Sequence, residues 1–404
     1  MRHLYSQAVQ RATAAPDRRR LLLGACLAPL LAAAEARAQP PRRPVLRVGP
    51  GRAVRSLGEA ARQARDGMLI EVDTGEYPGD VAVWRQNDLS LKAVGGRVRL
   101  PAGSAVAEGK GIFVSAGERI AIEGFDFSGA RAPDGNGAGI RLERGSLRLV
   151  DCSFSDCQMG LLSSDDAAAR LELLDCEFSR AATRPGDAPA HLLYVGGIAR
   201  LSVSGCYFHQ GRIGHLLKSR AAHNLITYNR LTDELGGRAS YELEFPNGGV
   251  AVLLGNLVQQ SAQTENPYLI VYGAEGLAPR GRHELCLAHN TLVDNLPRDG
   301  AYLRVAPGPV RVRAFNNLLV GNRRFATESS WDLRNNLVVD WDAFVLAARE
   351  NYTPRPGSPL RGKVVDPGPG PDGLSLRPER QYRHPRGSVA LSGPAQFPGA
   401  LQGA

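Results

Sequence analysis

Apolar and polar residues alternate in short segments along most of this chain, and the segments repeat. One copy reads LRLVDCSF at residues 147–154, and similar copies start near residues 120, 171, 201, 226, 253, 285 and 312. An alternation with period two places every second side chain on one face of a strand, whereas a helical repeat shows a period of 3.6. Each copy is therefore predicted to be a β-strand with one buried face.

The distance between consecutive copies varies from 19 to 34 residues. A stack of coils tolerates this variation, because each coil adds one rung of about 4.8 Å and longer loops leave the stack without disturbing it. Leucine-rich repeats have a similar length but a fixed consensus that this sequence lacks. We predict an all-β fold, a single-stranded right-handed parallel β-helix of about ten coils.

The residue that follows the bend in each copy is a cysteine in the early copies and an asparagine in the later ones. Equivalent positions in successive coils stack, so the amides are predicted to form a hydrogen-bonded ladder and the cysteines to fill a buried corner. Parallel stacked side chains make a disulfide torsion awkward, so buried free thiols are favoured over the alternative, a Cys152–Cys176 bridge. These positions are Cys152, Cys176, Cys206, Asn229, Asn256, Asn290, Asn317 and Asn336.

Both ends of the repeated region carry their own signals. Ser56 and Glu59 have the spacing of a capping box, and the alanines that follow predict a short helix over the N-terminal end of the stack. The β-helix domain is predicted at 39–353. Residues 354–404 hold ten of the 27 prolines and are predicted to form a loosely packed Pro/Gly-rich tail.

Residues 1–38 have the organisation of an export signal peptide. Three arginines at 18–20 precede an apolar run from Leu21 to Ala34, and an A-x-A cleavage pattern ends at Ala38. The order DRRRLLL at 17–23 is typical of a twin-arginine signal, and a Sec signal is the alternative. The apolar run is too short for a permanent span, so we predict cleavage near Ala38 and a periplasmic or secreted bacterial protein without a membrane span.

The net charge says little about partners once this segment is considered. The chain carries a formal charge of +9, and 1–38 holds six arginines and two acidic residues, so cleavage leaves +5. A mildly basic monomer is compatible with an acidic polysaccharide as partner and lacks the charge typical of a nucleic-acid-binding protein. No C-x-x-C pair occurs, so a structural zinc site is not expected.

Two segments resemble known β-helix proteins. Residues 66–77 read DGMLIEVDTGEY, and 351–359 read NYTPRPGSP; these resemble the opening and the ending of pectate-lyase-like β-helix proteins. The resemblance spans roughly residues 45–365 and implies the β-helix fold with its N-terminal capping helix. It does not imply one activity, because this fold carries lyases, hydrolases, epimerases and non-enzymes.

Lysine is rare, and one of the four lysines lies in the stretch that draws most attention. Residues 214–224 read GHLLKSRAAHN, which resembles the N-K-S-x-x-N segment of the alginate lyase and chondroitinase B type polysaccharide lyases. That resemblance implies that Lys218 is the base beside a uronic carboxylate. Gly211 and Ile213 stand where that family has its calcium-binding glutamates, so no cofactor is identified and calcium is unsupported.

The alternation also places charged residues near Lys218. Leu243 and Ile270 are natural inward positions, so Glu242 and Glu244 are predicted to face outward, and a one-residue slip would put Lys218 beside Glu244. β-Elimination from a uronate needs a cation for the carboxylate, a base for the proton beside it and an acid for the leaving oxygen. The candidate catalytic residues are Lys218 as base with a pKa lowered by its neighbour, Arg220 on the carboxylate, and His215, His223 or Tyr241 as acid.

The sequence is compatible with several functions. The leading hypothesis is an exported protein that acts on a uronate-containing polysaccharide by lyase-type β-elimination. The alternatives are a non-catalytic glycan-binding or exopolysaccharide-assembly scaffold, a hydrolase or epimerase using Glu242 and Glu244, and a purely structural Lys218–Glu244 ion pair. The candidate substrate-binding residues are Glu242, Glu244, Asn247, Glu265, Asn266 and Tyr268.

Overall fold

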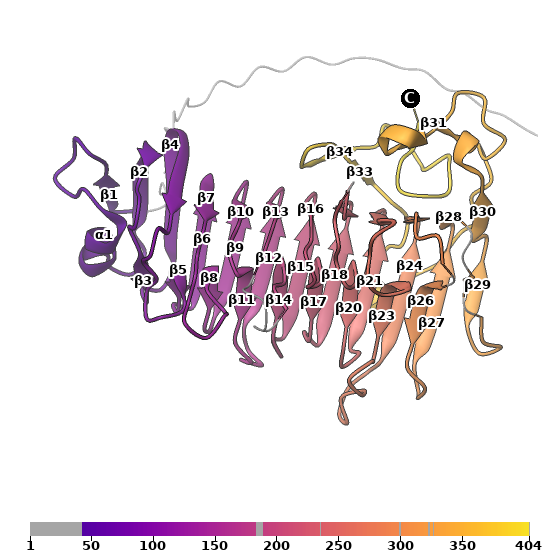
Figure 1. The fold of residues 1–404 in the computed structure, drawn as a ribbon, viewed down its shortest axis with the longest axis horizontal. Coiled ribbons are helices and arrows are strands. Elements are labelled where there is room, and N and C mark those ends of the chain that lie inside the picture. The colour runs from indigo at the N-terminus through magenta and orange to yellow at the C-terminus, as the bar shows by residue number, and fades with distance from the viewer. Residues whose placement is uncertain are drawn as a thin grey trace, which may run out of the picture. The chain divides into compact units, whose positions relative to one another are not determined.

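The computed structural model describes residues 43–403 except 183–188, 235, 299, 322–323 and 326. The predicted export signal lies outside these residues. From residue 43 the chain winds into parallel coils, and Figure 1 shows the strands of successive coils side by side. The predicted parallel β-helix is confirmed.

Strands of successive coils pair in parallel and build three faces. Face 1 consists of β1 (Val45–Val48), β2 (Leu69–Glu76), β4 (Leu89–Pro101), β6 (Arg119–Glu123), β9 (Ser146–Val150), β12 (Arg170–Leu174), β15 (Arg200–Ser204), β18 (His223–Thr227), β21 (Val250–Leu254), β24 (Glu284–Ala288), β27 (Arg311–Phe315) and β29 (Asp332–Arg334). Face 2 starts on the second half of β4 and continues with β7 (Phe125–Ser128), β10 (Ser153–Ser155), β13 (Glu177–Ser179), β16 (Tyr207–His209), β19 (Arg230–Thr232), β22 (Leu257–Gln260), β25 (Thr291–Asp294), β28 (Leu318–Val320) and β30 (Leu337–Val339). Face 3 consists of β3 (Ala82–Trp84), β5 (Gly111–Ser115), β8 (Ala138–Leu142), β11 (Met159–Ser163), β14 (Leu193–Val195), β17 (Leu217–Ser219), β20 (Leu243–Phe245), β23 (Tyr268–Tyr272) and β26 (Ala301–Val305).

The bend between face 1 and face 2 contains the predicted ladder. The residue before the ladder position takes a positive φ, 55° at Tyr228 for example, which turns the chain sharply into the next face. The Asn229 amide donates to the side-chain oxygen of Asn256 at 3.0 Å, and Asn256 donates in the same way to Asn290. Each amide is thus satisfied without water inside the stack. The bend cysteines of the earlier coils are buried and free, as predicted.

The interior is filled by side chains that repeat from coil to coil. Phe127, Phe154, Phe178 and Phe208 form a continuous stack, with ring centroids 4.6–5.1 Å apart. All four are buried. Dense apolar packing of this kind fixes the strand register, because a slip of one residue would turn these rings to the outside.

A short helix covers the N-terminal end of the stack. Helix α1 (Leu57–Gln63) begins after Ser56, whose hydroxyl accepts the backbone N–H of Glu59 at 3.1 Å. Leu57 and Ala60 are completely buried against the first coil. The predicted capping helix is therefore confirmed, and it covers apolar residues that the open end would otherwise expose.

The C-terminal segment is closely packed on the stack, and the prediction of a loosely packed tail is wrong. Leu376, Phe397 and Ala400 are buried, in clusters shared with residues of the coils. Besides these contacts to faces 1 and 2, the segment pairs strands within itself, and its sequence does not continue the repeat of the coils. Its elements are η1 (Trp341–Ala343), β31 (Phe344–Leu346), η2 (Ala347–Arg349), β32 (Asn351–Pro354), η3 (Pro371–Gly373), β33 (Arg380–Tyr382) and β34 (Ser388–Ala390).

Candidate functional site

The register of face 3 places Lys218 directly opposite Glu244. Leu217 of β17 pairs with Leu243 of β20, and Leu243 pairs with Ile270 of β23. The side chains of Leu217, Leu243 and Ile270 lie in the core. The next residue of each strand therefore points away from the core, so Lys218 and Glu244 lie side by side on the outer face of the sheet, where the surrounding residues bury them.

Lys218 forms ion pairs with two carboxylates. Its Nζ lies 3.1 Å from Glu244 Oε2 and 2.7 Å from Glu275 Oε1. The second oxygen of Glu275 lies 2.6 Å from Nη2 of Arg220. One carboxylate thus bridges two cations. The side chain of Glu275 is 42% exposed, whereas those of Lys218 and Glu244 are 11% and 4% exposed.

Arg220 is held in position by neighbours on both sides. Its Nε donates to the Tyr194 hydroxyl at 3.1 Å, and Nη1 donates to the side-chain oxygen of Asn247. Asn247 in turn donates to the carbonyl of Gly276 at 3.1 Å, which ties it to the loop that carries Glu275. The predicted residue Asn247 therefore joins the cluster as a support for Arg220.

An aromatic column runs beside these charges. The rings of His191 and His215 are stacked with centroids 4.6 Å apart, and those of His215 and Tyr241 are 5.0 Å apart. His191 Nδ1 accepts the backbone N–H of His215 at 2.9 Å. His215 Nδ1 lies 3.4 Å from Glu244 Oε2, so the column touches the ion-pair cluster at that carboxylate.

The charges in this cluster are strongly coupled. Burial opposes the charge of Lys218, but the hydrogen bond to Glu275 and the charge of Glu244 outweigh it, and the pKa of Lys218 is raised. Burial raises the pKa of Glu244 in spite of Lys218. For Glu275, hydrogen bonds from Lys218 and Arg220 outweigh burial and lower the pKa. The expected lowering of the Lys218 pKa by Arg220 is therefore wrong, because two carboxylates surround the ammonium.

The two histidines are held neutral. Burial, together with the positive charges of Lys218 and Arg220, lowers the pKa of His191 to about 3. Burial and the neighbouring His191 and Lys218 lower the pKa of His215 well below its ordinary value. Burial also raises the pKa of Tyr241, helped by the charge of Glu244. At neutral pH the site therefore offers a neutral imidazole and a protonated phenol beside two cations.

Two of the predicted residues lie elsewhere. Glu242 is completely buried and stands in the register between Leu216 and Leu269, which are core residues, so the prediction that it faces outward is wrong. The chain bends just before β20, and two consecutive positions face the core there. His223 begins β18 on face 1 and is exposed there, away from the strand of Lys218.

The remaining predicted residues flank the cluster. Tyr268 follows Tyr241 by one coil and lies under Arg304, whose guanidinium carbon is 5.4 Å from the ring centroid. The Asn266 amide donates to the Ser240 hydroxyl, which fixes the loop before β23. Glu265 is exposed, and its carbonyl accepts a hydrogen bond from Arg298.

Sequence reasoning missed Glu275 and His191. Glu275 lies on the loop after β23, where its backbone N–H donates to the carbonyl of Pro246 at 3.0 Å. No strand pattern extends to this loop. His191 was detectable, because it stands 24 residues before His215 and occupies the same position of the preceding coil.

A metal centre is not evident at this site. Among the described residues, no group of three or more His, Cys, Asp or Glu side chains is arranged to hold a metal ion. Glu244 and Glu275 are instead neutralised by Lys218 and Arg220. No helix in the described part of the chain has the length and apolar content needed to span a bilayer.

Comparison with known proteins supports the fold. No protein-family model matches the sequence, and no curated protein matches it. Among solved structures, the chain is similar to the crystal structure of pectate lyase Pel9A, with a TM-score of 0.60 and 12% sequence identity. The alignment covers 90% of this chain and 98% of that chain. The chain therefore has the pectate-lyase-like right-handed parallel β-helix fold, as the resemblance at 66–77 implied.

Proposed function

We propose that this protein acts on an acidic, uronate-containing polysaccharide through the cluster around Lys218. The observation that carries the proposal is the exposed carboxylate of Glu275, which bridges Lys218 and Arg220. A uronate carboxylate has the same shape and charge, and it can replace Glu275 between the two cations. An arginine side chain that is already held by Asn247 and Tyr194 needs little reorganisation to bind it.

The chemistry that fits this arrangement is β-elimination. Lys218 and Arg220 neutralise the substrate carboxylate, which acidifies the proton on the adjacent ring carbon. Neutral His215 removes that proton, and its imidazolium is stabilised by Glu244, 3.4 Å away. The electron pair forms the ring double bond, the glycosidic C–O bond breaks, and Tyr241 protonates the leaving oxygen. Lys218 thus serves as the electrophilic cation rather than as the base.

Binding without turnover is the second candidate, and the raised pKa of Lys218 favours it. A lysine that stays charged is suited to hold a carboxylate and unsuited to remove a proton. The hydrolase or epimerase alternative loses support, because Glu242 and Glu244 do not share a surface. The predicted signal at 1–38 leads us to propose further that either activity takes place in the periplasm or outside the cell.

The test is incubation of the purified protein with polygalacturonate, alginate and hyaluronate. Elimination produces an unsaturated uronate, which is followed by its ultraviolet absorbance and by product mass. Lys218→Met and His215→Gln are expected to abolish turnover. Lys92→Met is the matched control, because Lys92 also pairs with a cross-strand glutamate but on face 1.

The outcomes separate the two candidates. Absorbance that rises equally in Lys218→Met and in the control would exclude this site as the source. Binding of a polyuronate that is weakened in Lys218→Met but not in the control, without product from any substrate, would establish the binding function and reject the elimination. If the protein neither binds nor converts any of the three polymers, both candidates are rejected.

A further inference from the structure

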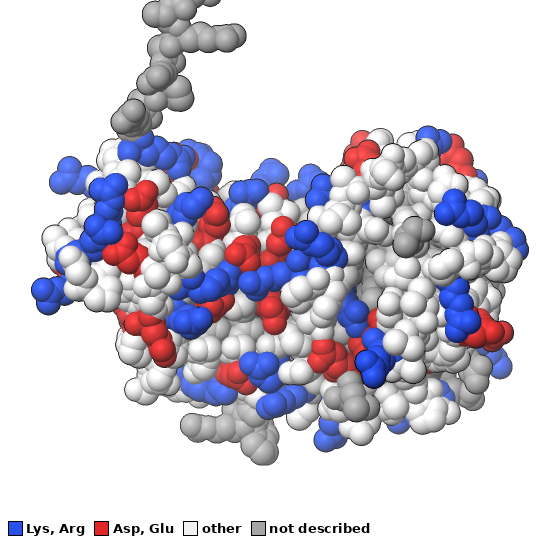
Figure 2. Space-filling view, turned by 90° about the horizontal axis from the view of Figure 1, so that it is seen from above, with Lys and Arg blue, Asp and Glu red and all other residues white. Residues whose placement is uncertain are grey.

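The two halves of face 1 differ in what covers them. From β18 to β29 the C-terminal segment lies over the face. Arg313 donates to the carbonyls of Pro369 and Pro367, and Leu376 is buried against Phe315 and its neighbours. From β4 to β15, no segment that the structure describes lies over the face. Figure 2, which looks from above onto the top of the stack, shows basic and acidic side chains interspersed between its N-terminal end and the C-terminal segment.

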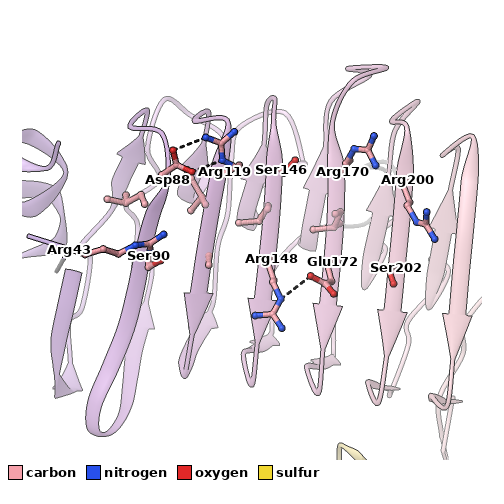
Figure 3. A pocket seen from close by; sticks show the side chains of 15 residues that line it. Arg43, Asp88, Ser90, Arg119, Ser146, Arg148, Arg170, Glu172, Arg200 and Ser202 are labelled. Atoms are coloured by element: carbon pink, nitrogen blue, oxygen red, sulfur yellow. Dashed lines mark hydrogen bonds and ion pairs between the residues drawn. The ribbon is translucent and has the colours of Figure 1, made fainter. Parts of the chain in front are cut away.

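The open half is hollowed into a groove of about 590 Å³ across five coils. Small outward residues, Ala121, Ser146 and Ser202, leave the space, and longer side chains form its sides. Figure 3 shows these strands from close by, with the labelled side chains rising from neighbouring strands. Five arginines line the groove against only two acidic residues. The arginines are Arg43, Arg119, Arg148, Arg170 and Arg200.

The groove keeps an excess of positive charge after its own ion pairs are formed. Arg119 pairs with Asp88, and Arg148 pairs with Glu172 at 2.8 Å. Arg170 and Arg200 form no ion pair with any residue that the structure describes. They are directly opposite each other on β12 and β15, so two free guanidinium groups stand one rung apart.

We propose that this groove is a second binding site, which holds an extended acidic polysaccharide chain. Rungs are about 4.8 Å apart, which is comparable to the length of one sugar residue in an extended chain. Arg170 and Arg200 lie one rung apart, so free cations succeed each other along the groove axis as carboxylates do along a polyuronate. Ser90, Ser146 and Ser202 offer hydroxyls to the sugar hydroxyls between them.

The lining favours a glycan over a single-stranded nucleic acid. Proteins bind unpaired bases by stacking them on aromatic rings, and the lining of this groove contains no aromatic residue. Glu172 and Asp88 can accept hydrogen bonds from the sugar hydroxyls of a glycan. The groove is on face 1 and the Lys218 cluster is on face 3, so this site does not depend on the proposed elimination.

The experiment measures binding of polygalacturonate to the full chain by calorimetry at low ionic strength. Arg170→Gln combined with Arg200→Gln is expected to raise Kd about tenfold and to make the salt dependence shallower. The matched control combines Arg99→Gln with Arg361→Gln, which removes the same charge from exposed arginines outside the groove. Ala121→Trp fills the hollow without changing charge and is expected to weaken binding with an unchanged melting temperature.

The results distinguish this site from the first one. All measurements are repeated in a Lys218→Met background, where binding to the groove is expected to persist even if no turnover exists. An equal loss in the control pair would show only a net-charge effect and overturn the proposal, as would unchanged binding in both the arginine pair and Ala121→Trp. Equal or tighter binding of oligodeoxythymidylate, with the same dependence on Arg170 and Arg200, would also overturn it.

Discussion

Two lysine–glutamate pairs on different faces show how one interaction acquires different roles. Lys218–Glu244 and Lys92–Glu123 both join adjacent rungs, with Nζ–oxygen distances of 3.1 and 3.2 Å. The side chains of the first pair are 11% and 4% exposed, and those of the second are 52% and 50% exposed.

Burial makes the difference between them. Water screens an exposed pair, so the Lys92–Glu123 pair contributes a few tenths of a kcal/mol. Around Lys218 a loop supplies Glu275, the neighbouring coil supplies Glu244 and the coil of Lys218 itself supplies His215, so the charges act on one another through protein rather than water. The same two residue types in the same register therefore add little stability on face 1, whereas on face 3 they belong to a cluster of strongly interacting charges.

The largest expected effect comes from removing the buried cation. Lys218→Met leaves Glu244 without its ammonium partner in a nearly dry position, and we expect the free energy of unfolding to fall by about 2–4 kcal/mol. Urea unfolding at neutral pH measures this change. If the free energy of unfolding falls less in Lys218→Met than in Lys92→Met, burial does not make the Lys218–Glu244 pair the stronger one.

Removing the buried carboxylate is expected to cost less. In Glu244→Gln, Lys218 keeps Glu275, and the amide remains a hydrogen-bond acceptor, so we expect a loss of about 1 kcal/mol at acid pH. Because the folded-state pKa of Glu244 is raised above 4.5, the folded protein holds this proton more tightly than the unfolded chain. The stability that Glu244 contributes is therefore present below pH 4.5 and is lost as pH rises through the raised pKa.

The measurement is the difference in unfolding free energy between the wild type and Glu244→Gln across that range. It is expected to shrink as pH increases above 4.5. A difference that grows with pH would show that attraction to Lys218, rather than burial, controls this carboxylate.

A smaller effect on stability, but a visible one on binding, is expected for Glu275→Gln. The side chain is 42% exposed, so its two ion pairs are worth less than about 1 kcal/mol. Because the carboxylate competes with the substrate for Lys218 and Arg220, its removal is expected to lower the Kd for a uronate oligosaccharide about threefold. Weaker binding in calorimetry would mean that Glu275 helps to hold the substrate and is not displaced by it.

The smallest effect is expected for Lys92→Met. Both partners are half exposed, and we expect the free energy of unfolding to change by less than about 0.5 kcal/mol, with no effect on turnover. Raising the salt concentration should abolish even this difference. If the free energy of unfolding falls by more than about 1 kcal/mol, exposed ion pairs stabilise the stack more than their exposure predicts.

Much of the fold could be predicted from local sequence patterns, because the same interactions between residues recur in every coil of a β-helix. Period-two alternation predicted the strands, and the recurrence of Asn256 and Asn290 after each bend predicted the amide ladder. Ser56 and Glu59 predicted the capping helix. Coil spacing placed Lys218 beside Glu244 only with a slip of one residue, and the strand pairing of the structure decided that register.

Other features depended on contacts between distant segments. Glu275 reaches Lys218 from a loop outside the strand pattern, and Glu242 faces inward because the bend before β20 interrupts the alternation. The C-terminal segment covers one half of face 1 and leaves the arginine-lined half open, which the composition of 354–404 did not indicate. The sequence by itself determined the coils and their bends, because these follow from neighbouring residues. Only the tertiary structure decided which outward side chains are buried, and burial sets the strength of charge interactions and hence the site.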